Sequence, residues 1–168
     1  MNNELLKGKF SNIFIKLLVG IMSNDLKDVK HFLSDDLINR FQKMINDNLK
    51  NNELRCFDEL NVKDIVIEKT SQDETYDYVY VSITSRYMDY YIDSNTSKYK
   101  RGIDDHRIEI NHQLIFRKKR EISTNNIAIR CSNCGANLDS NNSGYCKYCG
   151  KTNSAEDYDY ILCEITNL

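Results

Sequence analysis

The chain has 168 residues, 40% hydrophobic and 29% charged, enough for one domain with a packed core and a small appendage. A net charge of −2 leaves no excess of cations, which makes nucleic acid an unlikely main partner. The longest apolar-rich run, residues 10–22, is too short and too interrupted to cross a bilayer, and the amino terminus lacks the basic segment of a secretory signal. We therefore expect a cytoplasmic protein.

Three helices are predicted in the first 50 residues. Apolar residues recur at helical spacing over residues 5–22, and a short second helix is predicted over residues 29–33. Ser34 is placed to cap a third helix with a one-sided apolar face. That face consists of Leu37, Ile38, Phe41, Met44, Ile45 and Leu49. Each helix needs another surface to cover its apolar side.

After Asn52 the apolar period changes from helical to two, which predicts strands. A polar turn at residues 93–96 and a loop through Gly102 are expected to separate the two longest of them. The predicted strands cover residues 62–67, 76–92, 108–116, 127–130 and 158–165. Helices followed by long antiparallel strands predict an α+β fold, with the N-terminal helices packed on one face of a curved antiparallel sheet.

Two matching motifs, Cys131-Ser-Asn-Cys134-Gly135 and Cys146-Lys-Tyr-Cys149-Gly150, are typical of zinc knuckles. Each short loop turns two thiolates toward one point, and the glycine allows the tight turn behind the second sulfur. Four thiolates fill a tetrahedral site, so Cys131, Cys134, Cys146 and Cys149 predict one structural Zn²⁺, with a single iron as the second choice. The alternatives are two disulfides or one redox motif, which the duplication with matching glycines disfavours.

The segments that flank the cysteines, residues 127–130 and 158–165, are expected to pair as a hairpin with the metal unit in place of its turn. The chain then divides into helices plus curved sheet (residues 1–130), a zinc-ribbon insertion (131–150) and a final strand that returns to the sheet (151–168). Cys56 and Cys163 are expected to be buried thiols in a reducing compartment.

Tyrosine is abundant, with seven of the 11 between residues 76 and 99. Tyr78, Tyr80, Tyr87 and Tyr90 are candidates for a pocket wall with hydroxyl groups for a ligand. The alternative, which we favour, is that tyrosine suits half-buried strand faces. Asp89 lies near these tyrosines, but the chain has no nucleophile motif and no glycine-rich phosphate loop, so no specific signal indicates catalysis.

Two basic clusters are candidates for contact with an anionic surface, either lipid or an acidic partner. They are Lys98, Lys100 and Arg101, followed by Arg117, Lys118, Lys119 and Arg120. Basic clusters at strand ends and loops are more often only solvent-exposed residues at the edge of the fold. The first helix could also lie on a membrane, although its broad apolar face favours the core.

Residues 26–37 (LKDVKHFLSDDL), 60–67 (LNVKDIVI) and 90–98 (YYIDSNTSK) resemble the C-terminal domain of the mitochondrial inner-membrane import subunit Tim44 and its bacterial relatives. The resemblance covers roughly residues 5–120 and the last strand, and some bacterial relatives carry a knuckle pair before that strand. It implies a cone-like fold similar to nuclear transport factor two, with three helices on a strongly curved sheet around a hydrophobic pocket. It also implies membrane-surface association, a tethering or transport-related role and no catalytic residues.

The sequence departs from the family where tryptophan is usual, since Leu114 and Tyr160 stand there, and this puts lipid binding in doubt. We expect a non-enzymatic binding or scaffold domain with a structural zinc ribbon and a protein or small apolar ligand as partner. Two alternatives are a small-pocket enzyme resembling ketosteroid isomerases and dehydratases of the same cone fold, and a peripheral protein that binds anionic lipid.

Overall fold

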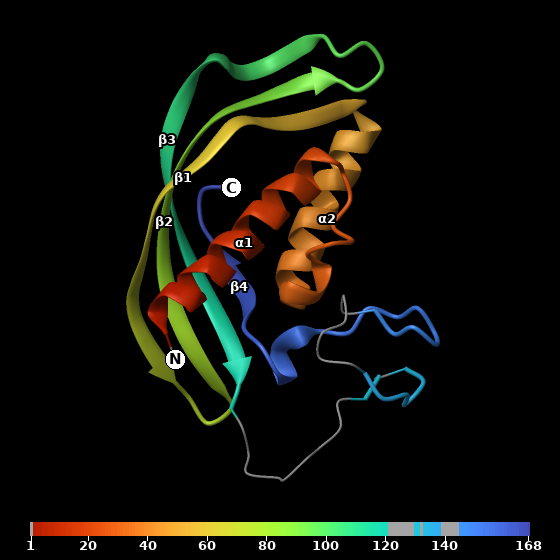
Figure 1. Ribbon diagram of the computed structural model, residues 1–168. Helices are drawn as coiled ribbons and strands as arrows, with labels where there is room; N and C mark the ends of the chain where they lie inside the picture. Colours follow the sequence, from red (N-terminus) through yellow and green to blue (C-terminus); the bar gives the residue numbers. More distant parts are fainter. Residues whose placement is uncertain (1, 121–129, 132, 139–144) are drawn as a thin grey trace.

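The computed structural model describes residues 2–120, 130–131, 133–138 and 145–168. Within these residues, the four strands form one antiparallel sheet in the order β1-β2-β3-β4, and both α-helices lie on the same side of it (Figure 1). The elements are α1 (Asn3–Met22), η1 (Lys30–Phe32), α2 (Asp35–Lys50), β1 (Glu53–Gln72), β2 (Tyr76–Asp93), β3 (Tyr99–Lys119), η2 (Ala155–Asp157) and β4 (Ile161–Ile165). The predicted α+β class with a curved sheet is confirmed.

The helix α2 begins where the sequence predicts, after the Ser34 cap, whereas α1 begins at Asn3, two residues before the expected start. The Asn2 side chain accepts a hydrogen bond from the Glu4 N–H, and the Ser34 hydroxyl accepts one from the Leu37 N–H. The predicted second helix is reduced to the single 3₁₀ turn η1. It ends there because Leu33 becomes extended and bridges Leu162 of β4, leaving no room for further helical turns.

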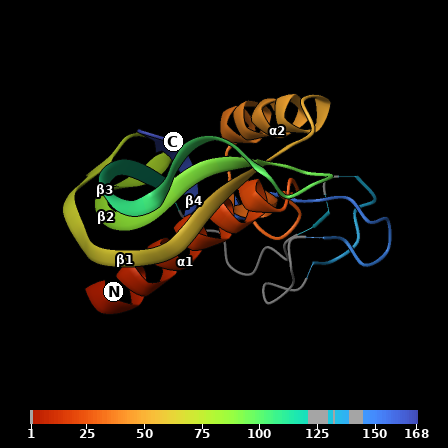
Figure 2. The same ribbon diagram turned by 90° about the horizontal axis from the view of Figure 1, so that it is seen from above.

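The sheet is curved because its three long strands contain several irregularities in register (Figure 2). Three interrupt the pairing of β1 with β2, and another lies between Tyr87 and Asp89 where β2 pairs with β3. Bulges bend a strand and increase its twist, so they let the sheet wrap around α1.

The segment through Gly102 is a strand, and the expectation of a loop there was wrong. Gly102 has φ +103° and pairs with Tyr90 of β2. A Cβ at this position would lie 2.5 Å from the Asp89 carbonyl oxygen, so close strand pairing explains the glycine that suggested a loop.

The main core lies between α1 and the concave face of the sheet. Phe10 of α1 stacks on Phe116 of β3 with ring centroids 4.0 Å apart, and both side chains are fully buried. On β2, the alternating residues Val79, Val81 and Ile83 are buried as their period of two predicts.

The final strand, β4, pairs with β3, whereas the sequence predicts a hairpin between residues 127–130 and 158–165. Leu162 lies opposite Phe116, so β4 extends the apolar face of β3. Of the expected partner segment, residues 127–129 lie outside the described residues, and Arg130 bridges Asn137 within the cysteine-containing segment.

Two polar side chains share the core beneath α1. His112 Nδ1 lies 2.7 Å from the Thr166 carbonyl oxygen, which can only accept, so Nδ1 carries the proton. His112 Nε2 therefore accepts from the Tyr87 hydroxyl at 3.2 Å, and both side chains have no exposed surface. Burial lowers the pKa of His112 and raises the pKa of Tyr87 to about 12.

We expect the stability of the fold to decrease as the pH falls below the ordinary histidine pKa of 6.5, because the unfolded chain then binds a proton that buried His112 resists. His31 acts in the same direction, since burial also lowers its pKa. Urea unfolding near neutral pH and near pH ~5.5 should show the loss, with a slope of up to about 1.4 kcal/mol per pH unit for each group. The variant His112→Gln should be less stable than wild type at neutral pH but less sensitive to acid. An identical acid sensitivity in the two proteins would contradict this assignment.

Candidate metal centre

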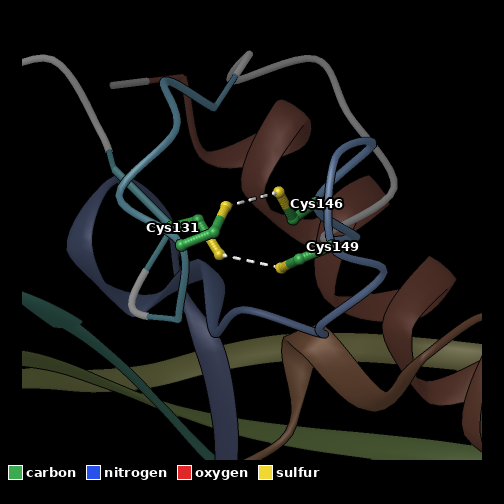
Figure 3. Close-up of side chains that lie close together, drawn as sticks. Cys131, Cys146 and Cys149 are labelled. Atoms are coloured by element: carbon green, nitrogen blue, oxygen red, sulfur yellow. Dashed lines mark hydrogen bonds between the residues drawn. The ribbon is translucent and has the colours of Figure 1, made fainter.

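The four cysteines of the two knuckles converge on one point. Their sulfur atoms all lie within 4.8 Å of one another. Two of the separations run between the knuckles, 3.6 Å from Cys131 to Cys149 and 3.5 Å from Cys134 to Cys146 (Figure 3). Zinc bonded tetrahedrally to sulfur at about 2.3 Å places its ligands about 3.8 Å apart. The four thiols therefore fit a single metal ion with no open coordination position.

The two knuckles have the same backbone geometry. In each, the glycine N–H bonds to the carbonyl of the first cysteine, Gly135 to Cys131 at 2.9 Å and Gly150 to Cys146 at 2.7 Å. The glycines have φ +73° and +75°, and no atom lies within 4 Å of a Cβ placed on either one. They are therefore required for the left-handed turn, as predicted, rather than for close packing.

Hydrogen-bond donors favour the thiolate form of two of the four cysteines, Cys131 and Cys149. The amides of Cys134 and Asn133 lower the pKa of Cys131 to about 6, and the Asn133 N lies 3.4 Å from its sulfur. The Asn133 side chain likewise lowers the pKa of Cys149. The Ala136 amide acts in the same direction on Cys134, but hydrogen bonding with the other thiols, together with desolvation, outweighs it, and the pKa of Cys134 is raised to about 11. Thiolates are the metal-binding form of cysteine, and an all-sulfur set suits zinc first and iron second.

The remaining cysteines lie away from this centre. All six are free thiols in the structure, and Cys56 and Cys163 are half-buried rather than fully buried. Burial raises the pKa of both, to about 11 for Cys163. They are therefore weak nucleophiles at neutral pH.

A hydrogen bond attaches the four-cysteine unit (residues 131–150) to the helical side of the fold. The Tyr145 hydroxyl donates to the Lys27 carbonyl oxygen at 2.8 Å. A cleft of about 260 Å³ lies between η1, the start of α2 and the segment after the second knuckle. It is lined by Lys30, His31, Leu33, Asp35, Ile38, Lys151, Thr152 and Ser154.

The four candidate tyrosines do not form one pocket. Tyr87 faces the core, whereas Tyr78 and Tyr80 line a cleft of about 350 Å³ on the opposite face of β2. Tyr90 follows the irregularity after Tyr87, and its hydroxyl donates to Asp58 at 3.2 Å. Strand alternation and one bulge therefore separate residues that are close in sequence.

The cleft that contains Tyr78 and Tyr80, which we call the β4 cleft, was not predicted. It forms where the start of α2, the outer faces of β2 and β3, η2 and β4 meet. Among the described residues that line it, the carboxylates are Asp35, Asp36, Glu156 and Glu164, and the basic group is Arg117, which pairs with Glu156 at 3.2 Å. Because these residues are far apart in the chain, no local motif marks the cleft.

The basic clusters are largely ion-paired. At least five of their seven residues have an acidic partner within 4.0 Å, which reduces the charge available to an anionic surface. The pairs are Lys100–Glu53, Arg101–Glu53, Arg117–Glu156, Lys119–Asp157 and Arg120–Asp77. Among the helices that the structure describes, none is long and apolar enough to cross a membrane.

Comparison with curated proteins gives no match for this chain. The family model described as Tim44-like domain matches residues 2–128, a range that includes α1, α2 and the three long strands but stops before the four cysteines of the knuckles. Because this match covers more than half of the sequence, the chain belongs to the Tim44-like domain family.

Proposed function

We propose that this chain is a non-enzymatic binding or scaffold domain in which a structural zinc ribbon supports a surface for a protein partner. The observation that carries the proposal is the convergence of four cysteine sulfurs within 4.8 Å on two knuckles of equal geometry. Cys131, Cys134, Cys146 and Cys149 would hold the ion, which would supply a cross-link between the knuckles. A site filled by four protein ligands leaves no position for a substrate.

The segment that leaves the second knuckle supports a wall of the β4 cleft. Ser154 caps η2 through a hydrogen bond to the Glu156 N–H, and Ala155 is fully buried. Glu156 then pairs with Arg117 on β3. A metal that fixes Cys149 therefore restricts the start of a segment that lines the cleft.

The charge of the β4 cleft favours a basic segment of a partner protein. Asp35 and Asp36 are exposed in the first turn of α2, and Glu164 projects from β4. Arg117 is compensated by Glu156, so the remaining carboxylates give the cleft a negative charge. Complementary charge increases the rate and the selectivity of association. A tethering or transport-related role of the family is compatible with such a contact.

The two alternatives have less support. A ketosteroid-isomerase-like site needs a reachable tyrosine hydroxyl inside the curved sheet, but Tyr87, the candidate on that face, is fully buried and bonded to His112. Tyr78 and Tyr80 line the β4 cleft on the opposite face of the sheet. An anionic-lipid site needs uncompensated cations, whereas most of the candidate cations are paired. A cytoplasmic location with peripheral membrane contact remains a prediction.

The partner surface can be tested with a photoreactive phenylalanine analogue in place of Tyr80. We expect cross-links in cells to a partner that contacts the β4 cleft, and they should weaken when Asp35 and Asp36 are replaced by asparagine. The matched control places the same analogue at Tyr99, which is 51% exposed and outside the cleft. Equal capture from both positions, or none from position 80, would argue against a partner at this cleft.

A further inference from the structure

The outward side of α1 carries a stripe of uncharged residues at alternating spacings of three and four: Leu5, Gly8, Asn12, Ile15 and Val19. These positions lie opposite the buried face of the helix. Leu5 is 71% exposed, Val19 49% and Ile15 36%, and Gly8 and Asn12 are also exposed. In Figure 2, α1 runs along the outer edge of the molecule.

The fold of a single chain does not account for this stripe. Glycine within a helix is destabilising relative to alanine, yet a Cβ placed on Gly8 would meet no atom within 4 Å from the rest of the described residues, apart from its neighbours and the helix backbone. A glycine in open space on a helix permits the close approach of another backbone. The 3–4 spacing is also the pattern of helices that pack along a second helix.

We propose that the α1 stripe binds the same stripe of a second copy of this chain, antiparallel, with the two-fold axis near Asn12. A two-fold axis brings the same patch of the two copies together, so a stripe with charge of one sign would repel itself. This stripe has no charged residue. Its one polar side chain, the Asn12 amide, offers both donors and an acceptor and can bond to the same group of the second copy.

The sizes of the residues favour the antiparallel direction. About a centre at Asn12, Leu5 faces Val19 of the second copy, and Gly8 faces Ile15. Each large side chain then meets a smaller one, as interdigitated packing requires. In a parallel pair, Gly8 would face Gly8 and leave a gap. The flanking Lys9 is paired with Asp159, which reduces its repulsion of the lysines of the second copy.

The contact area that one pair of α1 helices can bury determines how strong the dimer is expected to be. A helix of 20 residues is about 30 Å long, so one helix pair falls at the low end of interface sizes, below about 1,200 Å². The dimer should therefore be reversible and should increase with protein concentration.

Sedimentation velocity over a wide concentration range tests the proposal. Wild type should show a monomer–dimer equilibrium, and Ile15→Glu should weaken it by at least about tenfold, since it places two carboxylates in an apolar contact. The matched control is Leu49→Glu on α2, where the leucine is 57% exposed, and it should dimerise like wild type. Circular dichroism should show that both variants are folded. A wild type that stays monomeric throughout, or equal weakening by both variants, would overturn the proposal.

Gly8→Ala separates this interface from a role within the monomer. Alanine should raise the melting temperature at low concentration, because it favours the helix and meets no neighbour, and it should weaken dimerisation. A higher melting temperature with unchanged dimerisation would contradict the inferred contact.

Binding to liposomes of zwitterionic or anionic lipid tests whether a membrane, and not a second copy, covers the α1 stripe. Monomeric wild type that binds them through Ile15 would identify the membrane as the occupant instead and would also overturn the proposal.

Discussion

Replacing Cys131 with serine is expected to remove the bound metal and unfold the four-cysteine unit, while α1, α2 and β1–β3 keep their fold. Structural zinc contributes roughly 10–16 kcal/mol in zinc-finger peptides, and two knuckles of this size have little apolar surface to replace it. Elemental analysis should give about one zinc per chain for wild type and none for Cys131→Ser. The matched control is Cys56→Ser, since Cys56 lies on β1 outside the centre.

Loss of the metal in Cys131→Ser should also destabilise β4, but it should not destabilise the long strands. The segment from Cys149 to η2 leads directly into β4, whereas the long strands pair with one another through many residues. Hydrogen exchange should therefore become faster in β4 of the variant and stay unchanged in β1 and β2. Equal protection of β4 in the two proteins would show that the ribbon does not support this strand. A metal-free wild type with a complete fold would contradict the zinc assignment itself.

The convergence of Cys131, Cys134, Cys146 and Cys149 was predictable because the information is local. Each Cys-x-x-Cys-Gly motif specifies its own turn, and the positive φ of Gly135 and Gly150 matches what the motif requires. The start of α2 was predictable for the same reason, since Ser34 acts within one turn of its own position. The family resemblance, which implied the curved sheet, is confirmed by the match over residues 2–128.

Predictions that depended on tertiary pairing were less accurate. Gly102 resembles a loop residue until Tyr90 is placed beside it, and the bulge after Tyr87 changes the position of Tyr90 relative to Tyr78 and Tyr80. A bulge has no clear signature in the sequence, because it depends on how two separate strands pair with each other. The β4 cleft depends on the final arrangement of distant segments, so it could be found only in the folded chain.

The second large effect is expected for Phe116→Ala, which should lower the free energy of unfolding by about 3–5 kcal/mol. The Phe116 ring is fully buried, stacks on Phe10 of α1 and lies between Val79 of β2 and Leu162 of β4. Truncation would leave a cavity where one helix and three strands meet, and strands of these lengths cannot close it by a local shift. The loss is a large part of the roughly 5–15 kcal/mol typical of a domain. Urea unfolding of the metal-loaded protein measures it.

The neighbouring residue provides the control and connects stability to the proposed surface. Ile115 precedes Phe116 on β3 and lines the β4 cleft on the opposite face of the sheet. Because adjacent strand residues face opposite sides, Ile115→Ala should leave the core intact and lower the free energy of unfolding by only about 1 kcal/mol. It should, however, weaken capture of a partner from position 80. If Ile115→Ala were as destabilising as Phe116→Ala, the cleft would be part of the core, and the outer face of β3 would no longer qualify as a binding surface.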